Sequence, residues 1–117
     1  MRPNGIIYIH HNEVLFDKVY MPRGFFSRAR GLLARAELEA REGMFFMCCN
    51  AVHMLFMTRS IDIIFLDRRF FVTSIVVKAS PYRFYRDSKA FHTLECKSGI
   101  TFLKGIKVGQ KLTLEEI

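Results

Sequence analysis

"HMLFMTRSIDIIFLD", residues 53–67, is an apolar stretch that carries a histidine, an arginine and a carboxylate among its hydrophobic side chains. Residues 61–66 form a short continuous apolar run, which is typical of a buried strand. The segment therefore predicts two buried strands, at residues 52–57 and 61–66, joined at residues 58–60. Within the first strand, His53 would share a face with Leu55 and Met57, because side chains alternate along a strand.

Asp62 is the residue of this stretch that most needs an explanation. On the predicted strand it lies on the face of Ile64 and Leu66, opposite Ile63. An unpaired carboxylate is costly to bury, so we expect Asp62 to have a partner, either an arginine such as Arg59 or Arg83, or a histidine. Such a pair would fix the strand register or form part of a ligand site, and the residues alone leave both interpretations open.

The rest of the chain is mainly strand-like around a single helix. Residues 6–10 and 14–20 predict a hairpin, and the spacing of Phe25, Ala29, Leu32, Leu33 and Ala36 predicts an α-helix. Further short strands are expected at residues 44–48, 71–78 and 91–96 and after residue 109, with a surface loop from Pro81 to Ala90. The predicted fold is α+β and mainly β, a small barrel-like rolled sheet of about seven or eight short strands with one α-helix near residues 27–36.

Length and composition indicate a folded protein with an excess of positive charge. The 117 residues predict a single domain over 1–117, and 50% hydrophobic with 25% charged residues excludes a disordered tail. The formal net charge of +7 suits an anionic partner such as nucleic acid, a phosphorylated ligand or a membrane surface. The basic residues are dispersed, however, and no nucleic-acid-binding motif is present.

Cysteine usage and hydropathy favour a cytoplasmic location. Two of the three cysteines, Cys48, Cys49 and Cys96, are adjacent, which is unlike a disulfide framework and indicates reduced thiols. The uncharged stretch at residues 43–58 is shorter than the ~20 residues of a spanning helix and predicts two buried strands instead of a transmembrane segment. No secretion signal, metal-ligand spacing or nucleotide-binding motif is recognised, so no metal and no cofactor are expected.

A family pattern runs through most of the chain. "ARGLLAR" at 29–35, "EGMFF" at 42–46, "VHMLFM" at 52–57, "IDIIFLD" at 61–67, "SPYR" at 80–83, "TLE" at 93–95 and "GIKVGQKL" at 105–112 resemble domain-of-unknown-function family 192, an uncharacterised bacterial and archaeal family. The resemblance implies a compact β-rich, barrel-like fold with an early helix, and it brings no established activity. The matching positions are Arg30, Gly31, Leu32, Gly43, Met44, His53, Met57, Asp62, Phe65, Asp67, Arg83, Glu95, Gly99 and Gly109. Met54 and Phe56 depart from the pattern, because the family commonly has a small or polar residue directly after the histidine and a glycine or tryptophan just before the methionine.

The leading functional hypothesis is a small cytoplasmic binding or accessory module. Its ligand-binding patch would contain His53, Arg59, Asp62, Arg83 and Glu95, and it would take an anionic or polyol-like ligand. A second hypothesis is a hydrolase-type enzyme in which His53 is the base and Asp62 or Glu95 orients it. No nucleophile can be named for that reaction, so enzyme activity stays open and no catalytic residue is assigned. The third hypothesis is nucleic-acid binding by a basic barrel surface.

Overall fold

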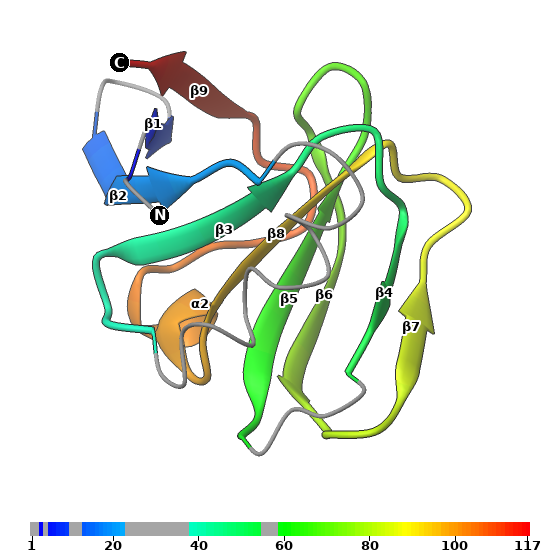
Figure 1. Ribbon diagram of the computed structural model, residues 1–117. Helices are drawn as coiled ribbons and strands as arrows, with labels where there is room; N and C mark the ends of the chain where they lie inside the picture. Colours follow the sequence, from blue (N-terminus) through cyan, green and yellow to red (C-terminus); the bar gives the residue numbers. More distant parts are fainter. Residues whose placement is uncertain (1–2, 4, 10–12, 23–37, 55–58) are drawn as a thin grey trace.

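The computed structural model describes residues 3, 5–9, 13–22, 38–54 and 59–117, and these form two β-sheets with one short helix (Figure 1). The elements are β1 Gly5–Ile9, β2 Glu13–Tyr20, β3 Glu42–Phe46, β4 Ala51–His53, β5 Ile61–Leu66, β6 Val72–Ala79, β7 Phe84–Arg86, β8 His92–Lys97, α2 Ile100–Leu103 and β9 Leu112–Glu116. Strands therefore dominate the described residues, as the sequence predicts. The helix expected near residues 27–36 lies outside the described residues.

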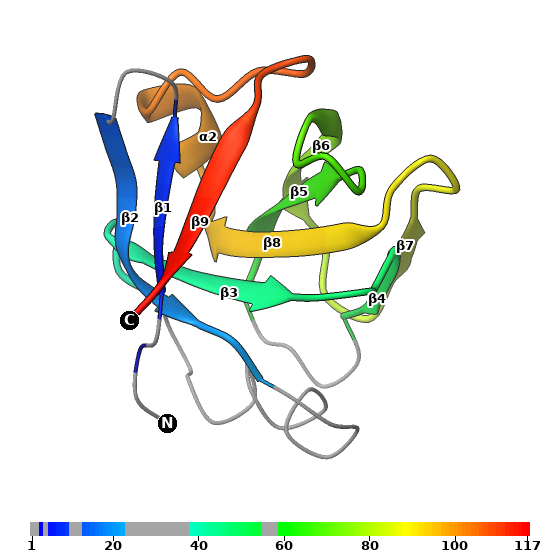
Figure 2. The same ribbon diagram turned by 90° about the horizontal axis from the view of Figure 1, so that it is seen from above.

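The larger sheet contains seven strands in the order β6-β5-β8-β3-β2-β1-β9. Its neighbouring strands are antiparallel except for β2 and β3, which pair in parallel. The hairpin of β1 and β2 agrees with the sequence prediction. The smaller sheet consists of β4 and β7 alone, and it lies on the side of the molecule away from β1, β2 and β9 (Figure 2).

The large sheet is rolled but does not close into a barrel. Its two end strands, β6 and β9, are not paired with each other, and Phe71 and Lys111, the residues directly before them, form an isolated bridge. The N–H of Val72 also donates to the carbonyl of Gln110 at 2.8 Å, and the N–H of Leu112 donates to the carbonyl of Phe70 at 2.9 Å. The predicted barrel-like shape is therefore only a loose description of this open, rolled sheet.

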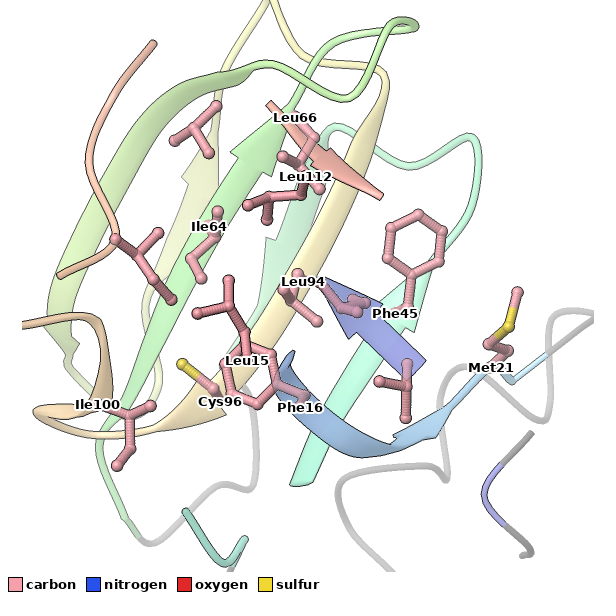
Figure 3. Close-up of a cluster of buried hydrophobic side chains, with 14 residues drawn as sticks. Leu15, Phe16, Met21, Phe45, Ile64, Leu66, Leu94, Cys96, Ile100 and Leu112 are labelled. Carbon is pink, nitrogen blue, oxygen red and sulfur yellow. The ribbon is translucent and has the colours of Figure 1, made fainter. Parts of the chain in front are cut away.

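β5 is buried on both faces of the large sheet. Ile64 and Leu66 of β5 belong to the main hydrophobic cluster, in which Figure 3 shows them near Leu94 and Leu112. Ile61, Ile63 and Phe65 belong to a second cluster on the opposite face. A strand that is covered on both sides reads as a continuous apolar run, which explains why its limits at residues 61 and 66 were predictable.

The strand expected at residues 52–57 is present as Ala51–His53, which pairs with β7 in the second sheet. Met54 lies outside this strand, and residues 55–57 lie outside the described residues. One expectation for the middle of the chain was wrong. The segment after Pro81, expected to be a surface loop, contains β7. In β7 only Tyr85 is half-buried, between two exposed neighbours, so three residues with this pattern give no clear strand signal.

Within the described ranges, no helix has both the length and the apolar character needed to cross a membrane.

Candidate functional site

Asp62 and Glu95 are the two buried members of the predicted patch, and they lie on opposite faces of the large sheet. In the pairing of β5 with β8, Asp62 is opposite Cys96, and Ile63 is opposite Glu95. Directly opposed residues share a face, whereas consecutive residues on a strand do not. Asp62 therefore lies with Cys96 on the face of the main cluster, and Glu95 lies with Ile63 on the other face. The structure does not bring these two carboxyl groups together.

Asp62 is fully buried and bound by backbone and hydroxyl donors from two other segments. Its Oδ1 accepts a hydrogen bond from the N–H of Lys78 at 3.0 Å. Its Oδ2 accepts from the N–H groups of Gly99 and Thr101, both at 3.1 Å, and from the Thr101 hydroxyl at 2.7 Å. These four donors are backbone N–H groups and a hydroxyl, a kind of partner that was not expected from the sequence. Asp62 thus joins β5 to the end of β6 and to the start of α2.

The local backbone explains why a carboxylate is needed at this position. The β5–β6 pairing has an irregularity between Ile61 and Ile63, and Lys78 has a positive φ of 52°. Such a bulge leaves an N–H group without a strand partner. Gly99 precedes α2 with a φ of 89° and provides no side-chain cap. Asp62 therefore satisfies both the N–H at the bulge and the free N–H groups at the start of α2.

The other three predicted patch residues are exposed. His53 ends β4 and pairs with Phe84 of β7, and the two rings are 4.9 Å apart between centroids. Arg83 directly precedes Phe84, and its carbonyl accepts the N–H of Met54 at 2.7 Å. His53 and Arg83 are therefore carried by the same end of the two-stranded sheet. Arg59 is exposed just before β5.

Glu95 lies in the middle of the large sheet, between Met44 of β3 and Ile63 of β5. Its side chain is 2% exposed, and its Oε2 has no hydrogen-bond partner among the described residues. Burial disfavours the charged form and raises the pKa of Glu95 to about 8. At neutral pH this carboxyl is therefore mainly protonated and can both donate and accept a hydrogen bond.

Sequence reasoning did not identify a second buried carboxylate on the same face, Glu42 of β3. Its Oε2 accepts the Tyr20 hydroxyl at 2.7 Å, and its Oε1 accepts the N–H of Glu39 at 2.9 Å. Glu42 is not among the predicted patch residues. The sequence signal for a buried Glu42 was its position directly before the apolar residues of "GMFF", where a charged residue is the first residue of a buried strand.

Glu42 and Glu95 are diagonal neighbours across β3 and β8. Met44 is opposite Glu95 and in parallel register with Tyr20, and Glu42 is two residues from Met44 on the same face. Diagonal partners of this kind have Cα atoms about 7–8 Å apart. Thr93 shares the face, and its hydroxyl donates to the carbonyl of Cys49 at 2.7 Å. We refer to Tyr20, Glu42, Met44, Thr93 and Glu95 as the carboxyl face.

His92, a buried histidine that was not part of the predicted patch, has a structural environment. Its Nδ1 accepts the N–H of Cys48 at 3.2 Å, and its ring contacts Phe45, Phe70 and Phe91 at centroid distances of 4.8–5.3 Å. Burial, with a smaller contribution from Arg68, lowers the pKa of His92. The imidazole is therefore held neutral within aromatic neighbours. In the part of the chain that the structure describes, no three histidine, cysteine or acidic side chains are grouped so that they could hold a metal ion.

Comparison with known proteins places the chain in a family. A protein of unknown function from Novosphingobium aromaticivorans DSM 12444 is 26% identical, with a TM-score of 0.78 over 94% of this chain and 83% of that one. A protein of Sinorhizobium meliloti 1021 described as a putative transcription regulator has a TM-score of 0.80 over 99% of this chain and 94% of that one. Its 17% identity makes this a likeness of fold alone. No curated protein matches the chain. The family DUF192, described as an uncharacterized ACR, matches residues 6–114, and the chain therefore belongs to the DUF192 family.

Proposed function

We propose that this chain is a small binding module that holds a hydroxyl-rich, polyol-like ligand against the carboxyl face, with Glu95 as the main polar contact. The observation that carries the proposal is the Oε2 atom of Glu95, which is buried and has no hydrogen-bond partner among the described residues. Buried polar atoms almost always have a partner, so a carboxyl without one in the centre of a sheet points to a partner from outside the described protein.

The protonation state of Glu95 selects the chemistry of the ligand. A carboxyl with a pKa of about 8 is neutral at pH 7 and presents one O–H donor beside acceptor oxygens. A ligand hydroxyl complements this group, because it also donates and accepts. A neutral acid brings no positive charge, so we favour a polyol over the anionic ligand that the sequence also suggested. Met44 and Ile63, which flank Glu95, would contact the apolar C–H surface of such a ligand.

Access to Glu95 requires part of its covering to move. Val52 of β4 and the adjoining Met54 form a buried cluster with Ile63 on this side of the sheet. We therefore expect the two-stranded sheet of β4 and β7 to shift when a ligand binds. His53 is exposed on this sheet and would contribute to the rim of the site. The proposal leaves out Asp62, which lies on the opposite face.

Calorimetric titration with glycerol, sorbitol, inositol and glucose tests this proposal. We expect the wild type to bind at least one of these polyols, E95Q to bind it more weakly, and E95L not to bind it. E95L should nevertheless be at least as stable as the wild type at neutral pH, because it removes an unsatisfied buried polar group. E115Q is the matched control, since Glu115 is exposed on β9. Binding that survives in E95L would exclude Glu95 as the contact, and a wild type that binds none of the four would refute the ligand class.

The hydrolase hypothesis gains no support from the geometry. His53 is exposed on β4, whereas both carboxyl groups considered as its partner, Asp62 and Glu95, are buried in the large sheet. Asp62 is in addition bound by four internal donors. We further infer that the chain is a single domain and that it works in the reducing cytoplasm. The inference of a reducing location rests on its three cysteines, Cys48, Cys49 and Cys96, which are all free thiols.

A further inference from the structure

The segment between β8 and β9 exposes large apolar side chains at adjacent positions. Phe102 and Leu103, at the end of α2, are 86% and 77% exposed, and Val108 in the following turn is 62% exposed. Single exposed apolar side chains are common on protein surfaces. Two adjacent large apolar side chains that are both almost completely exposed are a stronger indication of a binding surface. Phe102 and Leu103 therefore suggest contact with another apolar phase.

The same segment is positively charged. Residues 98–111 contain Lys104, Lys107 and Lys111 and no acidic residue. Lys107 and Lys111 are exposed. The ammonium of Lys111 is 5.7 Å from the ring of Phe71, and the guanidinium of Arg69 is 5.9 Å from the same ring. Arg69 therefore adds its charge to this surface from the turn between β5 and β6. We refer to Arg69, Phe102, Leu103, Lys107, Val108 and Lys111 as the loop patch.

The backbone of the loop patch is held by the body of the protein. Ile106 is buried, and its N–H donates to the carbonyl of Thr101 at 2.9 Å. The N–H of Gly109 donates to the carbonyl of Val72 at 2.8 Å, which ties the turn to β6. In Figure 2 the chain from α2 to β9 forms one margin of the molecule. The apolar side chains are thus presented outward by an anchored segment.

We propose that the loop patch docks onto an anionic membrane surface. Phe102 and Leu103 would enter the boundary between headgroups and acyl chains, while Lys107 and Lys111 contact the anionic headgroups. The combination of exposed apolar side chains with flanking lysines and no acids matches the two contributions to peripheral membrane binding. Nucleic acid would use the lysines but leave Phe102 and Leu103 in water. A symmetric second copy would bring the same lysines of both chains together.

Co-sedimentation with lipid vesicles tests this inference independently of the polyol proposal. We expect the full chain to bind vesicles of phosphatidylcholine mixed with phosphatidylglycerol, and to bind pure phosphatidylcholine weakly. The double variant F102S/L103S should lower binding by at least about tenfold. The matched control V77S/Y82S also replaces two exposed apolar side chains, and it should bind like the wild type.

The charge contribution is tested by a second matched pair of variants. K107E/K111E should lower binding to the mixed vesicles by about tenfold or more, since each lysine near an anionic surface contributes about 1 kcal/mol. K78E/K97E makes the same change in net charge at exposed positions outside the loop patch and should have a much smaller effect.

Three results would overturn the inference. One is a wild type that does not bind the mixed vesicles. Another is unchanged vesicle binding by F102S/L103S together with charge-dependent binding to single-stranded DNA, which would indicate a general polyanion surface. The third is a dimer by light scattering that F102S/L103S converts to a monomer, without vesicle binding, which would show that a second copy covers the patch.

Discussion

The stability of the fold should decrease as the pH rises from about 5 to about 8, because the Glu95 carboxyl must stay protonated in the folded state. Burial raises the pKa of Glu95 from 4.5 to about 8. Below pH 4.5 the group carries a proton in both the folded and the unfolded chain. Above that pH the unfolded chain loses the proton while the folded chain keeps it. The contribution to stability is therefore fully present at low pH and is lost as the pH approaches 8.

The size of this effect follows from the two pKa values. One pKa unit corresponds to about 1.4 kcal/mol, so the rise from 4.5 to about 8 corresponds to about 5 kcal/mol between the acidic and the alkaline limit. Such a loss is a large part of the roughly 5–15 kcal/mol that stabilise a typical domain. His92 acts in the opposite direction, because its lowered pKa favours folding as the pH rises towards 6.5. The Glu95 contribution must therefore be measured as a difference between variants.

Urea denaturation of the wild type and E95Q across this pH range isolates the contribution. Glutamine has nearly the same shape and does not titrate, so the free energies of unfolding of the two proteins should diverge in favour of E95Q as the pH rises. The parallel comparison with E115Q should remain flat, because Glu115 is exposed. A constant difference between wild type and E95Q from about pH 5 to about pH 8 would refute the reasoning that Glu95 is buried as a neutral acid.

Three further predictions concern the framework, and each is measured by urea denaturation at neutral pH. D62A should lower the free energy of unfolding by about 3 kcal/mol, because four donors, two of them on the buried Thr101, lose their acceptor, and a loss below about 1 kcal/mol would contradict the role of Asp62. G43A should destabilise by about 1–2 kcal/mol, since its Cβ would lie 3.0 Å from Cδ1 of the buried Leu94, and a more stable variant would count against this packing. F45A should lower stability by about 3–5 kcal/mol, whereas L103A, at an exposed position, should change it by less than about 1 kcal/mol.

Interactions between residues that are close in the sequence were the part of the fold that could be predicted best. An aspartate directly after a strand is typical of a turn, and the Oδ1 of Asp67, the residue after β5, accepts the N–H groups of Arg69 and Phe71 at 2.9 and 3.0 Å. Side chains of this type stabilise turns by bonding to nearby backbone, so the interaction depends on neighbouring residues only.

Pairing between distant segments was not predictable. Ala51–His53 pairs with Phe84–Arg86, a strand of three residues whose letters have no alternating pattern of useful length. Glu13–Tyr20 runs parallel to Glu42–Phe46, and the letters of the two strands do not show that they are neighbours. Both pairings depend on contacts that bury the faces of the large sheet, and these contacts involve residues far apart in the chain.

The prediction of the candidate site was limited in the same way, because it depends on which residues of two neighbouring strands are paired. Alternation along one strand placed Asp62 on the face of Ile64 correctly. Whether Asp62 and Glu95 share a face depends on the register between β5 and β8, where a shift of one residue reverses the answer. The partners of Asp62 could not be predicted from the sequence either, because nearly every residue has a backbone N–H group. Such a group is available to a side chain only where a bulge or the start of a helix leaves it without a backbone partner. A buried carboxylate can therefore be recognised from its neighbours in sequence. Whether it accepts structural hydrogen bonds, as Asp62 does, or has an oxygen without a partner among the described residues, as Glu95 has, depends on the register and the backbone geometry of the folded sheet.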